Sequence, residues 1–197
     1  MEPGRLSACA TVLAEAFLGD PLEVYALPDP EARRRVAPAQ FAAALRLGLL
    51  CGGAFTTGGE PRGAAVWLGP GETEIDPGRA RASGLAGLPT LLGPAASERL
   101  GRFWEHFHEV RRSLAGERYR YLFVIGVSPA WQGCGVGSAL VRSGLEQADK
   151  EWVSCFVETA QPANRPFYER HGFRLVWEGR DTPSGLRLLS FLRPAGG

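Results

Sequence analysis

The sequence predicts a single α/β domain, because strand patterns and helix patterns alternate along its 197 residues. Residues 120–127 have the β-branched and aromatic content of a buried strand, and an amphipathic helix pattern follows at residues 136–150. Residues 174–177 and 186–192 are expected to form two closing strands. With 45% apolar residues, the chain is long enough for one well-buried core and short for two.

The N-terminal part is expected to be helical. Helical spacing runs over residues 9–17, with Ser7 as the expected N-cap, and Gly19-Asp20-Pro21 should end this helix. A second helix is expected over residues 38–50, where Pro38 suits the first turn. If that helix instead begins near Glu31, Pro38 should kink it.

A β-hairpin and a mainly helical stretch follow. Residues 53–57 and 62–68 are β-rich and flank the turn signal Gly58-Gly59-Glu60-Pro61. Beyond them, helical patterns at residues 80–88 and 95–114 are separated by prolines. We expect this helical stretch to form a wall or lid over a binding site.

The loop between the central strand and the next helix is rich in glycine. It reads Gln132-Gly133-Cys134-Gly135-Val136-Gly137-Ser138. Glycine adopts positive φ without strain and lets a ligand approach the main chain closely. The helix that begins here adds unpaired N–H groups and the positive end of its dipole. The pattern therefore predicts a loop that binds a pyrophosphate.

Two well-known phosphate loops fit these residues poorly. A Walker-type loop ends in Gly-Lys-Ser/Thr, and no lysine occurs between Glu2 and Asp149. A dinucleotide-binding turn requires a third glycine where this chain has Ser138. Such a turn also opens a sheet of several further units, and only about forty residues remain after Glu158.

A third pattern, Gln/Arg-x-x-Gly-x-Gly/Ala, is satisfied at every defined position. With Val127-Ser128-Pro129 before it, Val157-Glu158-Thr159 after it and the run of residues 164–173 beyond, the loop resembles the acetyl-CoA loop of the GNAT superfamily of N-acetyltransferases. Within that superfamily the motifs are similar to those of the puromycin N-acetyltransferase group. The resemblance implies a mixed central β-sheet flanked by helices. Its usual first strand has only residues 1–6 available, so we expect that strand to be shortened or absent.

The resemblance also implies acetyl-CoA as co-substrate and a set of residues that bind it. Gly126 interrupts its strand, where a glycine often marks a bulge or a close approach. The implied contacts are the main chain of Ile125, Gly126 and Val127, the loop residues Gln132, Gly133, Cys134, Gly135, Val136, Gly137 and Ser138, and Asn164. For Ser138 and Asn164, helix capping is the alternative role.

Two residues are candidates for proton transfer. Glu158 follows a strand expected over residues 152–157, at the edge where α/β sheets bind ligands, and a carboxylate there can take a proton from an amine. By the resemblance, Glu158 is the base and Tyr168 the acid that protonates the departing thiolate. The alternatives are a structural strand-end acid for Glu158 and a core position for Tyr168. The implied reaction is direct attack in a ternary complex.

The charge, cysteine and histidine patterns argue against a nucleic-acid-binding, membrane-binding, disulfide-rich or metal-binding protein. The net charge of +1, with acids and bases interspersed, favours neither nucleic acid nor a membrane surface as a partner. The four cysteines form no C-x-x-C pair, which predicts neither a metal site nor disulfides and fits a cytoplasmic setting. His106 and His108 are two residues apart and should lie on different helix faces, so no metal is expected.

The acceptor is predicted to be a small amine with an apolar or aromatic part. Its site should form in the N-terminal part, about residues 1–118, whereas residues 119–197 should bind acetyl-CoA. The expected wall residues are Phe17, Asp20, Tyr25, Trp104 and Phe107. Two alternatives remain at this point: an acetyltransferase that modifies a protein or peptide, and a non-catalytic acyl-CoA sensor. A homodimer is possible.

Overall fold

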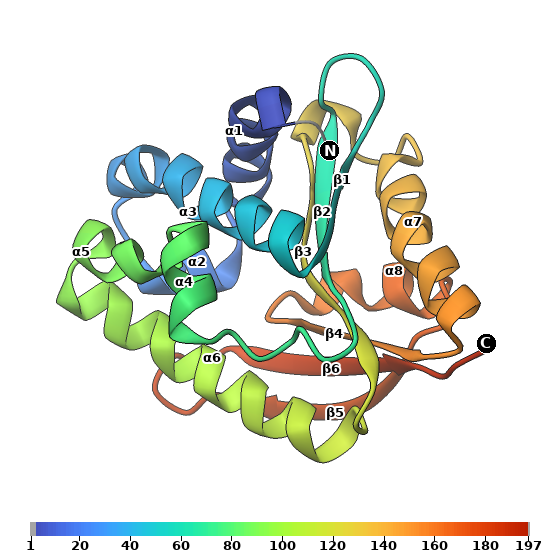
Figure 1. Ribbon diagram of the computed structural model, residues 1–197. Helices are drawn as coiled ribbons and strands as arrows, with labels where there is room; N and C mark the ends of the chain where they lie inside the picture. The colour runs from blue at the N-terminus through green and yellow to red at the C-terminus, as the bar shows by residue number, and fades with distance from the viewer. Residues whose placement is uncertain (1–2, 197) are drawn as a thin grey trace.

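The computed structural model describes residues 3–196, which form one six-stranded sheet and the helices around it. The strands are β1 (Gly52–Thr56), β2 (Gly63–Leu68), β3 (Tyr119–Val127), β4 (Ser154–Thr159), β5 (Arg174–Arg180) and β6 (Arg187–Arg193). Their order across the sheet is β1-β2-β3-β4-β6-β5 (Figure 1). Neighbouring strands are antiparallel except β3 and β4, so the sheet is mixed, as the sequence predicted.

The helices precede, connect and follow these strands. They are α1 (Leu6–Phe17), α2 (Pro21–Ala26), α3 (Pro30–Cys51), α4 (Pro77–Ser83), α5 (Leu88–Leu92), α6 (Pro94–Leu114), α7 (Val136–Glu151) and α8 (Arg165–Glu169). Short 3-10 turns occupy Pro3–Arg5, Leu85–Gly87, Pro129–Trp131 and Pro162–Asn164. Among the described residues, none of the helices has the length and apolar character required to cross a bilayer.

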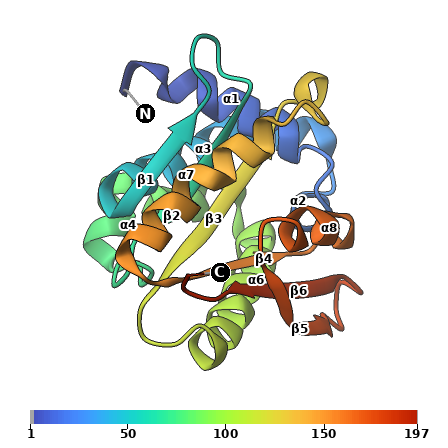
Figure 2. The ribbon, with the colours of Figure 1, turned by 90° about the vertical axis from the view of Figure 1, so that its right-hand side faces the viewer.

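Helices cover both faces of the sheet (Figure 2). On β2, Val66 and Leu68 pack with α1 and α3, whereas Trp67 points to the other face and packs with α7. A Cβ on Gly144 of α7 would lie 2.1 Å from the Trp67 ring, so only glycine allows this close approach. Helix α6 completes the enclosure, because Phe103 and Phe107 pack against the C-terminal strands.

The strands β3 and β4 part at the centre of the sheet (Figure 1). Their parallel pairing begins at Tyr119 and Ser154 and ends at Leu122 and Val157. Strand β3 continues to Val127 paired with β2 alone. The register with β2 shifts at the same level, so one residue of β3 has no partner there. The edge of β3 that faces β4 is consequently open beyond Leu122 in the described structure.

Two boundaries in the N-terminal part differ from the predictions. Helix α1 begins at Leu6 after the turn at Pro3–Arg5, so Ser7 lies inside the helix, and the predicted Ser7 cap is wrong. Residues 3–5 form no strand, in agreement with the expectation that the first strand is shortened or absent, and Met1 and Glu2 lie outside the described residues. Helix α3 begins at Pro30, because the Asp29 side chain accepts hydrogen bonds from the first amides of the helix. The expected start at Pro38 was therefore wrong, and the observed start lies close to the alternative near Glu31.

The other predicted elements are present with small shifts. The hairpin of β1 and β2 is confirmed. The predicted helix over residues 80–88 is instead α4, which ends at Ser83, followed by a 3-10 turn, because Gly84 adopts a φ of +92°. The strand expected from Trp152 begins at Ser154, because Trp152 has a φ of +52° and ends helix α7.

Candidate active site

A cavity of about 980 Å³ lies where β3 and β4 part. The end of β3, the glycine-rich loop and the start of α8 form most of its wall. Of the residues predicted to bind acetyl-CoA, the cavity is lined by Ile125, Gly126, Val127, Gln132, Gly133, Gly135, Gly137, Ser138 and Asn164. The two others, Cys134 and Val136, are not part of the wall: Cys134 is exposed and Val136 packs in the core under α7.

The glycines of the loop are required by its backbone and its packing. Gly133 and Gly135 have φ values of +77° and +82°, which L-residues adopt only with strain. A Cβ on Gly137 would lie 3.1 Å from the ring of Phe167, so this glycine lets α7 approach α8. The loop thus delivers the first amides of α7 to the cavity wall, an arrangement that favours an anion.

The polar residues of this wall take roles that differ in part from the predicted ones. The Gln132 side-chain amide donates to the Val127 carbonyl at 3.3 Å and so ties the loop to β3. Ser138 lines the cavity, and no side chain caps α7, whose N-cap residue is Gly135. Asn164 precedes α8 but makes no capping bond; its Nδ2 donates to Thr159 Oγ1 at 3.4 Å. For Ser138 and Asn164, capping is therefore not the role that the structure gives them.

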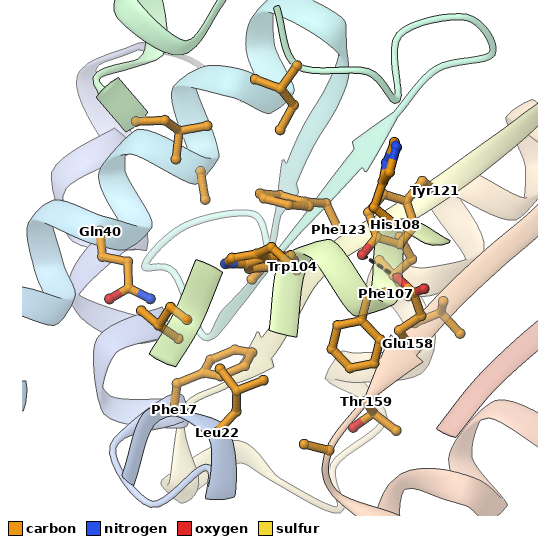
Figure 3. Close-up of a pocket in the computed structure, with 18 of the residues that line it drawn as sticks. Phe17, Leu22, Gln40, Trp104, Phe107, His108, Tyr121, Phe123, Glu158 and Thr159 are labelled. Atoms are coloured by element: carbon orange, nitrogen blue, oxygen red, sulfur yellow. Dashed lines mark hydrogen bonds between the residues drawn. The ribbon is translucent and has the colours of Figure 1, made fainter. Parts of the chain in front are cut away.

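A second cavity of about 550 Å³ lies on the N-terminal side of the sheet (Figure 3). Of the predicted acceptor residues, Phe17, Asp20, Trp104 and Phe107 line it. The predicted helical wall is also present, because side chains of α5 and α6 close the cavity. Tyr25 was predicted wrongly: its ring packs edge-on against Phe103 at a centroid distance of 5.8 Å, away from both cavities.

The two cavities meet at a shared set of residues. This junction consists of Phe17, Asp20, Ile125, Asn164 and Tyr168, each of which lines both cavities. It lies beside the open edge of β3. A group held in one cavity therefore faces a group held in the other across this junction.

Tyr168 belongs to the junction and is 4% exposed. Its ring packs against Phe167, Phe173 and Phe191, which fixes its position. Burial raises the pKa of the hydroxyl above its usual value, and the charge of Asp20 raises it further. Tyr168 consequently stays protonated at neutral pH and has a proton to donate.

Glu158 is almost fully buried and held by two donors. Arg111 Nη1 lies 2.7 Å from Glu158 Oε2, and the Tyr121 hydroxyl donates to the same oxygen at 2.8 Å. Burial raises the pKa of Glu158 to about 7, while Arg111 and Tyr121 pull it down. The carboxyl group lines the second cavity (Figure 3). A pKa near neutrality suits a group that must accept a proton and release it again.

Arg111 and two of the four acids that line the second cavity were not predicted from the sequence. Arg111 continues the buried stripe of Phe103 and Phe107 along α6, and a cation on an apolar stripe is a signal of a buried partner. Besides Asp20 and Glu158, which were predicted as a wall residue and as the base, the cavity wall contains Glu23 and Glu74. Glu23 lies in the first turn of α2, and no motif of the sequence drew attention to it.

The histidines are separate, as predicted. The His106 ring packs against Trp177 at a centroid distance of 4.9 Å, whereas His108 lines the second cavity near Glu74. In the part of the chain that the structure describes, no three His, Cys, Asp or Glu side chains gather as they would around a metal ion.

Comparison with known proteins accounts for this architecture. Residues 99–175 match the family model of the acetyltransferase (GNAT) domain. A solved structure from Corynebacterium glutamicum, described as histone acetyltransferase HPA2 and related acetyltransferase, has a TM-score of 0.69 at 22% identity, covering 100% of this chain and 94% of that chain. The chain has the GNAT fold. The open edge of β3 and the glycine-rich loop are thus parts of a GNAT fold.

Two further proteins are similar to this chain, one in structure and one in part of its sequence. Arylalkylamine N-acetyltransferase 2 from Aedes aegypti has a TM-score of 0.61 at 12% identity, covering 98% of this chain and 96% of that chain. A mycothiol acetyltransferase of Nocardiopsis dassonvillei is 38% identical over 66 residues, which are 32% of this chain. The chain spans only 20% of the length of that curated relative. The narrower likeness to the puromycin N-acetyltransferase group stays a prediction.

Proposed function

We propose that the protein is an acetyl-CoA-dependent N-acetyltransferase that acts on a primary amine of a small molecule. The junction at Ile125, Asn164 and Tyr168 carries this proposal, because these residues face both cavities. One cavity has a wall of backbone amides and glycines, and the other has aromatic side chains and acids. A donor and an acceptor bound in these two cavities meet at a protonated tyrosine.

The first cavity fits acetyl-CoA in its chemistry. The amides around Gly133, Gly135 and Gly137 suit the pyrophosphate, and Arg170 adds a cation to the same wall. The open edge of β3 at Ile125, Gly126 and Val127 offers main-chain groups to an extended amide-bearing chain. When bound, acetyl-CoA supplies an acetyl group activated as a thioester.

The chain's own residues then handle charge and protons. Glu158 takes the proton that the amine loses as its nitrogen bonds to the acetyl carbon, directly or through water. A free N–H of the β3 edge stabilises the negative charge that develops on the carbonyl oxygen, an effect worth about 3 kcal/mol in comparable sites. Tyr168 gives its proton to the sulfur as the carbon–sulfur bond breaks. The proton gained at Glu158 and the proton lost at Tyr168 balance.

The size and lining of the second cavity favour a small acceptor. Its volume of about 550 Å³ lies in the range of cavities for small ligands. The Trp104 and Phe123 rings stack at a centroid distance of 5.3 Å and form an apolar surface within it (Figure 3). An arylalkylamine acetyltransferase among the structural neighbours is in keeping with such an acceptor.

The test is release of free thiol from acetyl-CoA in the presence of single amines, run beside calorimetric binding of CoA. The amines are para-ethylbenzylamine, a linear polyamine, an aminoglycoside, puromycin and a lysine peptide. Release with a small amine supports the proposal. Faster release with the peptide favours a protein acetyltransferase, CoA binding without release on any amine favours a sensor, and absence of CoA binding refutes the assignment of the first cavity.

A further inference from the structure

One limb of the second cavity carries a buried acid and amide that the proposed reaction does not use. Glu23 of α2 is 8% exposed and lines the cavity together with Gln40 of α3. Gln40 Nε2 donates to Glu23 Oε1 at 2.6 Å. The oxygen Gln40 Oε1 is buried and has no hydrogen-bond partner among the described residues. A buried acceptor without a donor is costly, unless a ligand supplies the donor.

The acidic side chains of this limb also form no ion pairs within the described structure. Neither Glu23 nor Asp20, which lies beside it, forms an ion pair with any described residue. Arg33 is the cation that acts on Glu23, but its guanidinium donates to the carbonyls of Leu18, Leu27 and Pro28.

The pKa of Glu23 reflects this setting. Burial raises it to about 7, the charge of Asp20 raises it further, and Gln40 and Arg33 lower it. A bound cation would shift Glu23 toward its charged form.

An apolar surface separates Gln40 from the carboxylate assigned as base (Figure 3). Gln40 and Glu158 stand on opposite sides of the cavity, and the rings of Trp104 and Phe123 lie between them (Figure 3). Phe41, Leu88 and Leu92 add apolar side chains to the cavity wall. The apolar surface of Trp104 and Phe123 thus lies between Gln40 and Glu158.

We propose that the acceptor carries a second cationic nitrogen, which Glu23 and Gln40 bind; this inference rests on the proposed function. An apolar or aromatic spacer joins this nitrogen to the reacting amine. The second nitrogen is an ammonium, amidinium or guanidinium, because each donates more than one hydrogen bond. One donor satisfies the Glu23 carboxylate and another reaches Gln40 Oε1. The acceptor is thus a spaced diamine or an aminoalkyl amidine or guanidine.

The test compares two amines of nearly equal shape, para-xylylenediamine and para-ethylbenzylamine. They differ in that a terminal methyl replaces the second amine. A charge-assisted hydrogen bond predicts that wild-type kcat/KM is roughly 10- to 100-fold higher for the diamine. Glu23→Gln keeps the shape of the side chain and removes its charge, so this ratio should fall toward one, after correction for the two equivalent amines.

Glu31→Gln is the matched control, because Glu31 lies on an exposed turn of α3 with a side chain 74% exposed. In this variant the ratio of kcat/KM for the two amines should keep its wild-type value. Calorimetric binding of both amines gives the same comparison without turnover, and thermal unfolding reports whether each variant is folded.

The outcomes separate this inference from the proposed function. Equal kcat/KM for the two amines in the wild type, with thiol release intact, refutes the second-nitrogen site and leaves the transferase in place. A diamine preference that survives Glu23→Gln refutes the role of Glu23. If no amine releases thiol, the proposed function fails. Tighter calorimetric binding of the diamine than of para-ethylbenzylamine, lost in Glu23→Gln, then still supports the cation site. Equal binding of the two amines refutes it.

Discussion

Tyr168 and Glu158 are both buried, and burial disfavours the charged form of each. The phenol is held neutral by its apolar ring contacts, whereas the carboxyl group has a cation and a phenol as partners. Desolvation raises both pKa values, which keeps a proton on Tyr168 and brings Glu158 to about 7. The pair therefore offers one donor and one acceptor at the same pH, as acid–base catalysis requires.

Tyr168→Phe should lower kcat about 100-fold, because the variant lacks the proton for the departing sulfur. The dissociation constant of CoA should stay near its wild-type value, since the ring contacts are kept. Single-turnover thiol release and calorimetry measure the two quantities. Tyr25→Phe, which removes a hydroxyl outside both cavities, is the control. Equal turnover by Tyr168→Phe and wild type would remove Tyr168 as the acid.

Arg111→Gln should shift the acidic side of the profile of kcat/KM against pH to higher pH. In the wild type kcat/KM should fall as the pH drops through about 7, because Glu158 becomes protonated. Arg111 lowers the pKa of Glu158, so its removal raises that pKa, and the acidic side of the pH profile moves to higher pH with it. Arg112→Gln changes an exposed neighbour and should leave the acidic side of the profile in place. An acidic side that does not move in Arg111→Gln argues against Glu158 as the base.

At the scale of elements, the glycine-rich loop combines a backbone requirement with a binding role. Gly135 ends the loop as the N-cap residue of α7 with a φ of +82°, and no other atom lies within 4 Å of the place where its Cβ would be. Its side-chain position is thus open to the solvent and the ligand. A substitution there strains the backbone and crowds whatever binds against the loop.

Gly135→Ala should weaken CoA binding by roughly 10-fold or more, while the strain itself costs about 1–2 kcal/mol of stability. Gly116→Ala is a matched control, because Gly116 has a φ of +77° and an equally open Cβ position but lines neither cavity. Both variants should lose similar stability in thermal unfolding. Calorimetry should find weaker CoA binding for Gly135→Ala alone; equal affinities would mean that the loop binds something else.

Local patterns predicted the elements well where one signal dominates. The buried face of α7 (Val136, Leu140, Val141, Gly144, Leu145 and Ala148) follows from 3.6-residue spacing, and the β1–β2 hairpin follows from its turn residues. Two starts were open for α3, near Glu31 and at Pro38. The helix begins at Pro30, because Asp29-Pro30, a cap followed by proline, outweighs the signal of Pro38 inside the helix.

The site was predictable to the extent that it is contiguous in sequence. The loop and the residues near Tyr168 lie within one stretch, so their motif could be read directly. Arg111 and Glu158 are 47 residues apart, and Glu23 and Gln40 come from different helices. Such pairs form only when separate elements pack, and periodicity within one element carries no information about them. The second cavity was therefore predicted in outline and not in charge.

At the scale of the whole molecule, the parting of β3 and β4 leaves backbone groups without a strand partner. Pairing stops at Leu122, although β3 extends to Val127. A sheet normally covers or pairs such an edge. Here the edge lies inside the molecule, at the wall of the first cavity, so a ligand is the natural partner of these groups.

Saturating CoA should slow hydrogen exchange at backbone amides of residues 123–127, because the ligand pairs with the edge that faces β4. At 100 times its dissociation constant the ligand should also stabilise the protein by about 2.7 kcal/mol. Exchange measured by mass spectrometry on peptides from β3 tests this, with peptides from β2, already paired on both sides, as the internal reference. Protection confined to other segments would place the ligand elsewhere.

The two cavities draw their walls largely from different elements, and this affects how the acceptor specificity of such a protein can change. The first cavity draws its wall from the end of α1, the turn after it and residues 125–170, whereas α2, α3, α5 and α6 contribute only to the second. Substitutions in those four helices change what is recognised and leave the donor site intact. New acceptor specificities are thus within reach of a few point mutations, and a library randomised at Gln40, Leu88 and Trp104 is where selection should find them.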